Sequence, residues 1–141
     1  MKSLIDKAFF LKRVRLFHEL ELELLLAIGE KLHEDDYDAK EKIFAFNQAA
    51  NRIYFVVKGS VEILNANGKS LGLLGAHQYF GDESLFNEQP RAYSAVCQTN
   101  TLLLSLSRSH LLSIISECPS VAVSLIQAYS QKLPCRVAQP T

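Results

Sequence analysis

Hydrophobic and polar residues follow three successive patterns along this chain of 141 residues. In the first pattern, apolar residues recur at helical spacing within residues 5–14 and again at positions 22, 25, 26, 28 and 32. This spacing predicts two helices within about residues 3–32. An acidic patch, Glu34-Asp35-Asp36, marks the change to the second pattern.

The second pattern, over about residues 33–107, is a series of short apolar segments at even spacing, which is typical of β-strands. The pair Asn67-Gly68 between two such segments predicts a tight hairpin turn. One helical turn near residues 82–86 interrupts the series. Evenly spaced short strands predict a small barrel or sandwich, which makes the chain mostly β with flanking helices (α+β). The candidate strands are Ile43–Phe46, Arg52–Lys58, Val61–Asn65, Ser70–Leu74, Arg91–Thr99 and Leu102–Leu106.

The third pattern is helical again and begins after Ser107, which with Ser109 is a candidate N-cap. Pro119 suits the first turn of a last helix that extends to about residue 133. Because this last helix is apolar over more than one narrow stripe, it must cover the barrel, a partner, or both. We therefore expect one domain over residues 1–133, with helices at about 3–32, strands at about 33–107 and helices at about 108–133, and a flexible tail over 134–141.

Charge and cysteine content narrow the classes of function. Fifteen basic and fifteen acidic residues cancel, so charge gives no indication of broad binding to nucleic acid or to an anionic membrane. The longest apolar run, residues 24–28, is too short to span a bilayer, and charged residues interrupt any signal-peptide core. Cys97, Cys118 and Cys135 form neither an even disulfide framework nor a metal-binding spacing, which favours reduced thiols and a cytoplasmic location.

The sequence carries no catalytic or metal-binding pattern. It has no serine–histidine–acid set, no phosphate-binding GxxxxGK[ST] loop and no paired-acid motif. The four histidines are scattered, with no His-x-His pair. We therefore expect no enzyme activity, no catalytic residue, no metal and no resident cofactor.

The strongest candidate site lies in Phe80-Gly81-Asp82-Glu83-Ser84-Leu85-Phe86, followed closely by Pro90-Arg91-Ala92-Tyr93-Ser94-Ala95. A glycine lets the backbone approach a ligand closely, and an acid accepts hydrogen bonds from sugar hydroxyls. The backbone N–H groups that open a short helix favour an anion, and the planar guanidinium of an arginine matches a phosphate with two parallel hydrogen bonds. Together these groups suit one small sugar phosphate.

These two segments resemble the phosphate-binding cassette of cyclic-nucleotide-binding domains, the regulatory modules of catabolite activator proteins, cyclic-nucleotide-dependent kinases and gated channels. The resemblance extends from about Phe10 to Leu133 and includes Ile53–Ile63, which is similar to a hairpin of the family. It implies a double-stranded β-helix, or β-roll, of jelly-roll type, with N-terminal helices and C-terminal capping helices. It also implies a non-catalytic sensor whose last helix responds to a cyclic nucleotide.

The resemblance assigns roles to individual residues. Arg91 with the N–H groups of Ser84 and Ala92 would hold the phosphate, and Gly81 and Asp82 would hold the ribose. Alanine at position 92, where threonine accompanies cyclic GMP, favours cyclic AMP over cyclic GMP. The full set of implied ligand-binding residues is Phe80, Gly81, Asp82, Ser84, Leu85, Arg91, Ala92 and Ser94, with Leu125, Ile126 and Tyr129 as candidates for a lid over the base.

Several positions depart from the family pattern and leave alternatives open. Asp82 replaces the usual glutamate, Glu83 adds a second acid for which we expect a solvated side chain, and Tyr93 stands where a small residue is usual. Tyr93 either faces the outside of its strand or crowds the site. Arg91 is either a phosphate anchor or a structural arginine paired with Asp82 or Glu83. Glycines of the family are replaced at Lys40, Asn47 and Ala49, for which we expect different turns.

These departures support a second hypothesis, in which the domain binds no nucleotide and serves for dimerisation or protein docking. The partners expected under the sensor hypothesis are a cyclic nucleotide and an effector protein or domain that the sequence does not identify. The last helix is also a candidate surface for a homodimer. Because little chain follows that helix, we expect no DNA-binding helix-turn-helix domain and no nucleic-acid binding by this chain alone.

Overall fold

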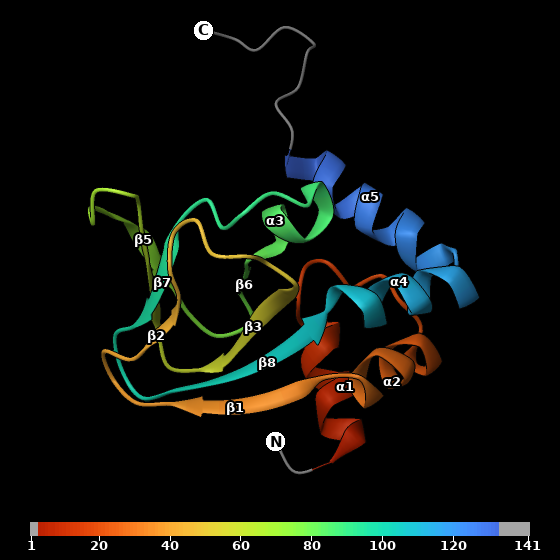
Figure 1. Cartoon of the computed structure of the whole chain (residues 1–141). Helices are drawn as coiled ribbons and strands as arrows, with labels where there is room; N and C mark the ends of the chain where they lie inside the picture. The colour runs from red at the N-terminus through yellow and green to blue at the C-terminus, as the bar shows by residue number, and fades with distance from the viewer. Residues whose placement is uncertain (1–2, 133–141) are drawn as a thin grey trace, which may run out of the picture.

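The computed structural model describes residues 3–132 and consists of two antiparallel sheets packed face to face, with helices gathered at one end (Figure 1). One four-stranded sheet has the order β1-β8-β3-β6 and the other has the order β2-β7-β4-β5. The strands are β1 His33–Tyr37, β2 Lys42–Phe44, β3 Arg52–Lys58, β4 Val61–Leu64, β5 Ser70–Leu74, β6 Tyr79–Phe80, β7 Ser94–Cys97 and β8 Thr101–Ser107. This arrangement confirms the predicted β-roll with flanking helices.

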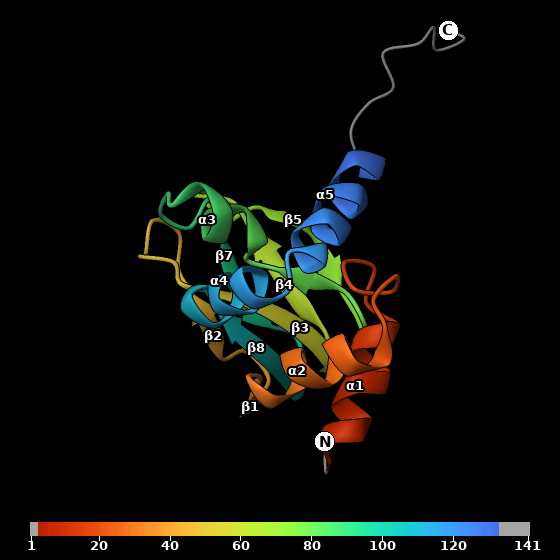
Figure 2. The same ribbon diagram turned by 90° about the vertical axis from the view of Figure 1, so that its right-hand side faces the viewer.

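The helices are α1 Leu4–Lys12, α2 Leu22–Glu30, α3 Asp82–Asn87, α4 Arg108–Glu117 and α5 Ser120–Lys132. In two views α1, α2 and α4 lie together against one end of the roll (Figures 1 and 2). A hydrogen bond from Tyr129 to Asp82 connects α5 to α3. The hydroxyl of Ser107 accepts a hydrogen bond from the His110 N–H and caps α4, as the sequence predicts. Residues 133–141, which include the predicted tail, lie outside the described residues.

Alternation along β3 and β8 divides the interior into two cores, because successive side chains of a strand point to opposite faces. Ile53 and Phe55 pack with Leu104 and Leu106 against the helices, and we call this cluster the helix-side core. The intervening side chains face the space between the two sheets. We call that second cluster the roll core, and its buried members are Phe44, Val56, Val61, Phe80, Ala95 and Leu103.

Three strands differ from the sequence prediction: β7, β1 and the two-residue β6, which was not among the candidates. The predicted strand Arg91–Thr99 is shorter and begins at Ser94, so Arg91 precedes the strand. The strand β1 was not among the candidates because His33–Tyr37 carries three acids instead of an apolar run. It lies at an edge of its sheet, where charged side chains discourage further strand pairing. The hairpin predicted at Asn67-Gly68 joins β4 to β5, and the Gly68 N–H donates to the Asn65 carbonyl.

The loops at Lys40 and Asn47 do not have the changed turns that we expected from the loss of the family's glycines. Lys40 and Asn47, which stand where the family has glycines, both keep left-handed backbone with φ of 71° and 69°. Such a conformation costs a non-glycine residue about 1–2 kcal/mol. Ala49 is not among the residues with positive φ.

Within the described residues, no single helix is long and apolar enough to cross a membrane. Only α4 and α5 taken together reach that length and apolar composition, and the two helices are bent by 116° relative to each other.

Candidate functional site

A left-handed turn at Gly81 joins β6 to α3 and places the predicted cassette. Gly81 has φ of 82°, and a Cβ at this position would lie 2.6 Å from Nη1 of Arg91. Both the backbone conformation and the close approach therefore require glycine. The helix α3 begins at the next residue, so Asp82 and Glu83 form its first turn.

Arg91 is the buried cation of the site, with only 4% of its surface exposed. Its Nη1 donates to the carbonyl of Gly81 and its Nη2 to the carbonyl of Arg52, each at 2.8 Å. The guanidinium carbon lies 4.1 Å from the ring centroid of Phe44, a cation–π distance. The buried Nε has no hydrogen-bond partner among the described residues. Burial lowers the pKa of Arg91, which nevertheless stays charged at neutral pH.

The structural alternative for Arg91 predicted an ion pair with Asp82 or Glu83. No carboxylate of residues 3–132 forms an ion pair with Arg91, whose partners are backbone carbonyls and aromatic rings. Buried charges are usually paired with an opposite charge or a metal. Arg91 is therefore a buried cation without an anionic side chain in contact.

Tyr93 crowds the site, which decides between the two orientations left open by the sequence. Its half-buried side chain reaches the turn, where Oη accepts the Gly81 N–H at 2.7 Å and donates to Glu83 Oε2 at 2.9 Å. Its ring lies 5.7 Å from the ring of Phe44. Glu83 is exposed, as expected, and in addition its carboxylate accepts a hydrogen bond from Tyr93, which the sequence did not predict. Desolvation and the neighbouring Asp82 charge raise the pKa of Glu83.

Asp82 points the other way, toward α5. It is 6% exposed, and its Oδ2 accepts a hydrogen bond from the Tyr129 hydroxyl at 2.8 Å. Phe86 of α3 makes an edge-on contact with the Tyr129 ring at 5.8 Å between centroids. Between α3, α4 and α5 lies a groove of about 470 Å³ whose lining includes Leu125, Ile126 and Tyr129 but not Arg91. The three lid candidates thus come together beside α3.

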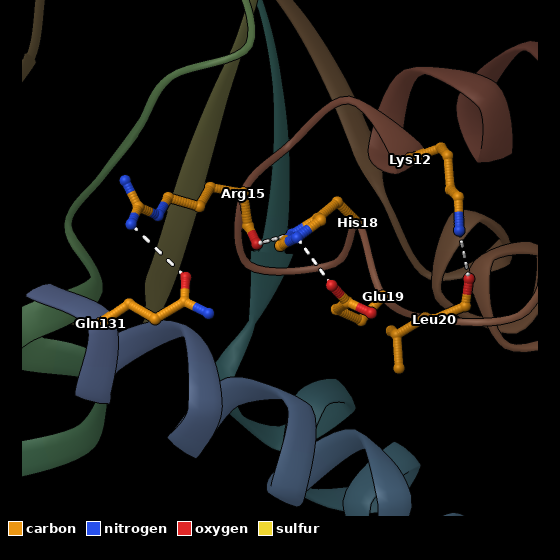
Figure 3. Close-up of polar contacts among 6 residues, drawn as sticks. All are labelled: Lys12, Arg15, His18, Glu19, Leu20 and Gln131. Carbon is orange, nitrogen blue, oxygen red and sulfur yellow. Dashed lines mark hydrogen bonds and ion pairs between the residues drawn. The ribbon is translucent and has the colours of Figure 1, made fainter.

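A second attachment holds α5 on its other side. In Figure 3, Arg15 from the segment between α1 and α2 reaches Gln131 of α5, with Nη2 to Oε1 at 3.5 Å. The same segment is fixed by His18, whose Nδ1 lies 2.7 Å from the Arg15 carbonyl and whose Nε2 lies 3.0 Å from Glu19 (Figure 3). α5 therefore contacts α3 and the segment of residues 13–21, and it also buries Val121, Leu125 and Ala128 in the helix-side core.

The remaining predicted residues have mainly structural contacts. Leu85 is fully buried in the helix-side core, and Phe80 stacks on Tyr54 in the roll core at 5.2 Å between centroids. Ser84 Oγ donates to the Pro90 carbonyl, and Ser94 Oγ accepts the Phe46 N–H. Ala92 is exposed and has no side-chain atom beyond Cβ.

Sequence reasoning missed the aromatic surroundings of Arg91. Phe44 and Tyr54, which flank the guanidinium at 4.1 and 5.8 Å, come from β2 and β3, far from the cassette in sequence. Because side chains alternate along β3, Tyr54 points to the opposite face of the strand from Phe55. This alternation is the sequence signal that could have placed Tyr54 beside the roll core. Among residues 3–132, no group of three histidine, cysteine or acidic side chains is arranged to hold a metal ion.

The arrangement agrees with a family match. The model of the cyclic nucleotide-binding domain matches residues 34–118, which is more than half of the chain. The chain belongs to the cyclic nucleotide-binding domain family. This match includes both sheets, α3, Arg91 and α4, and it confirms the resemblance found in the sequence.

Similar proteins and structures come from several bacterial regulators. The CRP-like cAMP-activated global transcriptional regulator of Mycobacterium tuberculosis is 26% identical over 127 residues, which are 87% of this chain and 57% of that protein. The solved catabolite activator protein of Thermus thermophilus is 32% identical, with a TM-score of 0.74, over 84% of this chain and 57% of that one. The N-terminal domain of a Streptomyces coelicolor transcriptional regulator is 25% identical, with a TM-score of 0.78, over 87% and 91%. The chain thus spans little more than half the length of the two full regulators.

Proposed function

We propose that this cyclic nucleotide-binding domain is a non-catalytic regulatory sensor that binds cyclic AMP in preference to cyclic GMP and transmits binding through α5. The observation that carries the proposal is Arg91, a buried cation whose Nε lacks a partner and whose guanidinium contacts no carboxylate of the described chain. A phosphate supplies the missing negative charge and accepts parallel hydrogen bonds from a guanidinium.

The other roles follow from the positions around Arg91. The N–H groups of Ser84 and Ala92 complete the phosphate site, and Asp82 with Gly81 binds the ribose. Phe80 and Ser94 support this site from the roll, and Leu85 anchors α3 in the helix-side core. The preference for cyclic AMP rests on Ala92, which offers no side-chain hydroxyl to a guanine.

Nucleotide binding can be transmitted to α5 because Asp82 would serve both the ribose and Tyr129. Its carboxylate now accepts the Tyr129 hydroxyl, so a ribose hydroxyl at the same carboxylate competes with α5. A ligand shifts a conformational equilibrium only by its different affinity for the two states, and this competition supplies such a difference. On α5, Leu125, Ile126 and Tyr129 are the proposed contacts to the base.

Calorimetric titration with cyclic AMP and with cyclic GMP tests the sensor function. The matched set is the wild type, Arg91→Ala, and Arg91→Lys, which keeps the charge but not the planar fork. We expect saturable binding, tighter for cyclic AMP, that Arg91→Ala abolishes and Arg91→Lys weakens. Absence of heat with both nucleotides, from wild-type protein shown to be folded by circular dichroism, would refute the function.

One observation favours a second function, that of a docking or dimerisation module without a nucleotide. Tyr93 already holds the Gly81 N–H, and α5 presents Val123 and Ile126 with 53% and 65% of their surface exposed. A homodimer through α5 would cover these side chains. Sedimentation equilibrium of the wild type and of Val123→Ser/Ile126→Ser, without nucleotide, tests the dimer. A dimer that the double variant disrupts, in a protein that gives no heat with either nucleotide, would establish the docking function.

The wider partners belong to the same proposal. We propose an effector protein or domain that responds to α5, a cytoplasmic location in keeping with the buried free thiol of Cys97, and no nucleic-acid contact by this stretch of chain. The balanced charge of the sequence supports the last point, since DNA-binding surfaces are strongly basic.

A further inference from the structure

One hydroxyl group links two unusual side chains of the site. Tyr93 stands where the family pattern has a small residue, and Glu83 adds an acid beside Asp82. The Tyr93 hydroxyl accepts the Gly81 N–H at 2.7 Å and donates to Glu83 Oε2 at 2.9 Å and Oε1 at 3.3 Å. A single hydrogen-bonded group thus connects the turn before α3, the first turn of α3 and the segment after Arg91.

The same residue, Gly81, is bonded from both sides. Its N–H donates to Tyr93 and its carbonyl accepts from Arg91 Nη1. The Tyr93 ring also packs against Phe44, the ring on which the Arg91 guanidinium lies. A ligand that binds Arg91 and Gly81 together must therefore use the volume beside Phe44 and the donor that Tyr93 holds.

We propose that Tyr93 is a gate that sets the affinity of the site, with Glu83 as its latch. A cyclic nucleotide enters only when the Tyr93 side chain turns away from Gly81 and Glu83. Tyr93 is only partly buried, so its side chain is not enclosed on all sides. This inference rests on the sensor function proposed above and adds the residue that controls it.

The latch opposes the ligand in two ways. Opening leaves Glu83 without its phenol donor, and hydrogen bonds to charged groups are the stronger ones. The freed carboxylate then lies near an anionic phosphate, with which it interacts unfavourably. A protein with a small residue at position 93 has no phenol hydrogen bond to lose on binding, so it should bind the same ligand more tightly even though Glu83 keeps its charge.

Four proteins test the gate by calorimetry with cyclic AMP: wild type, Tyr93→Ala, Tyr93→Phe and the control Tyr37→Phe. Tyr37 is a tyrosine of β1 that packs at the margin of the same roll core. We expect Tyr93→Ala to lower Kd about tenfold, which corresponds to about 1.4 kcal/mol. Tyr93→Phe keeps the ring, so it preserves the packing and should show a smaller gain, while Tyr37→Phe should match the wild type.

A second measurement follows the gate itself. Ring signals of ¹³C-labelled tyrosine, with Tyr93 assigned through Tyr93→Phe, should shift for Tyr93 when the wild type is saturated with cyclic AMP. Equal Kd values in all four proteins, or saturation without a shift of the Tyr93 signal, would overturn the gate and leave the sensor function intact. Absence of binding by all four folded proteins would overturn both, and binding by Tyr93→Ala alone would support the gate and show that the wild-type site is closed.

Discussion

The two cores of this domain are built from the same strands but differ in what they bury. The helix-side core joins Ile53 and Phe55 to the helices with apolar contacts alone. On the opposite face of β3, the roll core ends at a charged guanidinium surrounded by Phe44 and Tyr54. The first cluster is apolar, whereas the second ends at a charge with hydrogen bonds, which under the proposed function a ligand exchanges. We infer that stability and sensing lie on opposite faces of one strand.

Substitution of two neighbouring residues of β3 should have the largest effect on the free energy of unfolding. Phe55 is fully buried in the helix-side core, so Phe55→Ala should lower the free energy of unfolding by about 3–5 kcal/mol. Tyr54→Ala should cost clearly less, because Tyr54 is only partly buried. Urea unfolding of both variants measures the difference. Equal losses would show that the two faces do not differ in the way proposed.

Removal of the Tyr129 hydroxyl should have an intermediate effect confined to α5. Tyr129→Phe loses the hydrogen bond to Asp82, and one such bond contributes about 1 kcal/mol. We expect faster amide hydrogen exchange in α5 with little change in β3 and β8. Ser130→Ala, which removes a hydroxyl that bonds only within α5, is the matched control. Uniformly faster exchange throughout the domain would argue against a separately movable α5.

The free energy of unfolding should depend on pH through the protonation of Glu83. Because its pKa is raised in the folded protein, the folded state keeps this proton at pH values where the unfolded chain has lost it. This contribution to the free energy of unfolding is present below the ordinary glutamate pKa of about 4.5 and is lost as pH rises through the raised value. Glu83→Gln removes it, so the variant should gain stability relative to the wild type across that interval. A constant difference from pH 4 to pH 8 would contradict the assignment.

The smallest effect on stability is expected at an exposed lid candidate. Ile126 is 65% exposed, so Ile126→Ala should change the free energy of unfolding by no more than about 0.5 kcal/mol. Leu125→Ala, at a buried neighbouring position, should cost about 2–5 kcal/mol. If Ile126 contacts the base, its variant should nevertheless weaken cyclic AMP binding. An unchanged Kd would remove Ile126 from the lid.

The sequence predicted the parts of this molecule that depend on local spacing. Apolar periodicity located β3, β4, β5 and β8, and the cassette motif placed Gly81 and Arg91 in one site. What it missed depends on contacts between distant segments. The direction of Tyr93 is set by Gly81 and Glu83, and the partners of Arg91 include the carbonyl of Arg52 and the ring of Phe44. An edge strand such as β1, with its acidic residues, also lacks the apolar pattern by which strands are recognised.

We propose that Arg91 serves a ligand more than it serves the fold. Urea unfolding of the wild type and of Arg91→Ala, each with and without cyclic AMP, tests it most directly. At a concentration 100 times the Kd, a ligand that binds only the folded state raises the free energy of unfolding by about 2.7 kcal/mol. We predict this increase for the wild type and none for Arg91→Ala. An equal response of the two proteins to cyclic AMP, or a wild type that does not respond at all, would contradict the account.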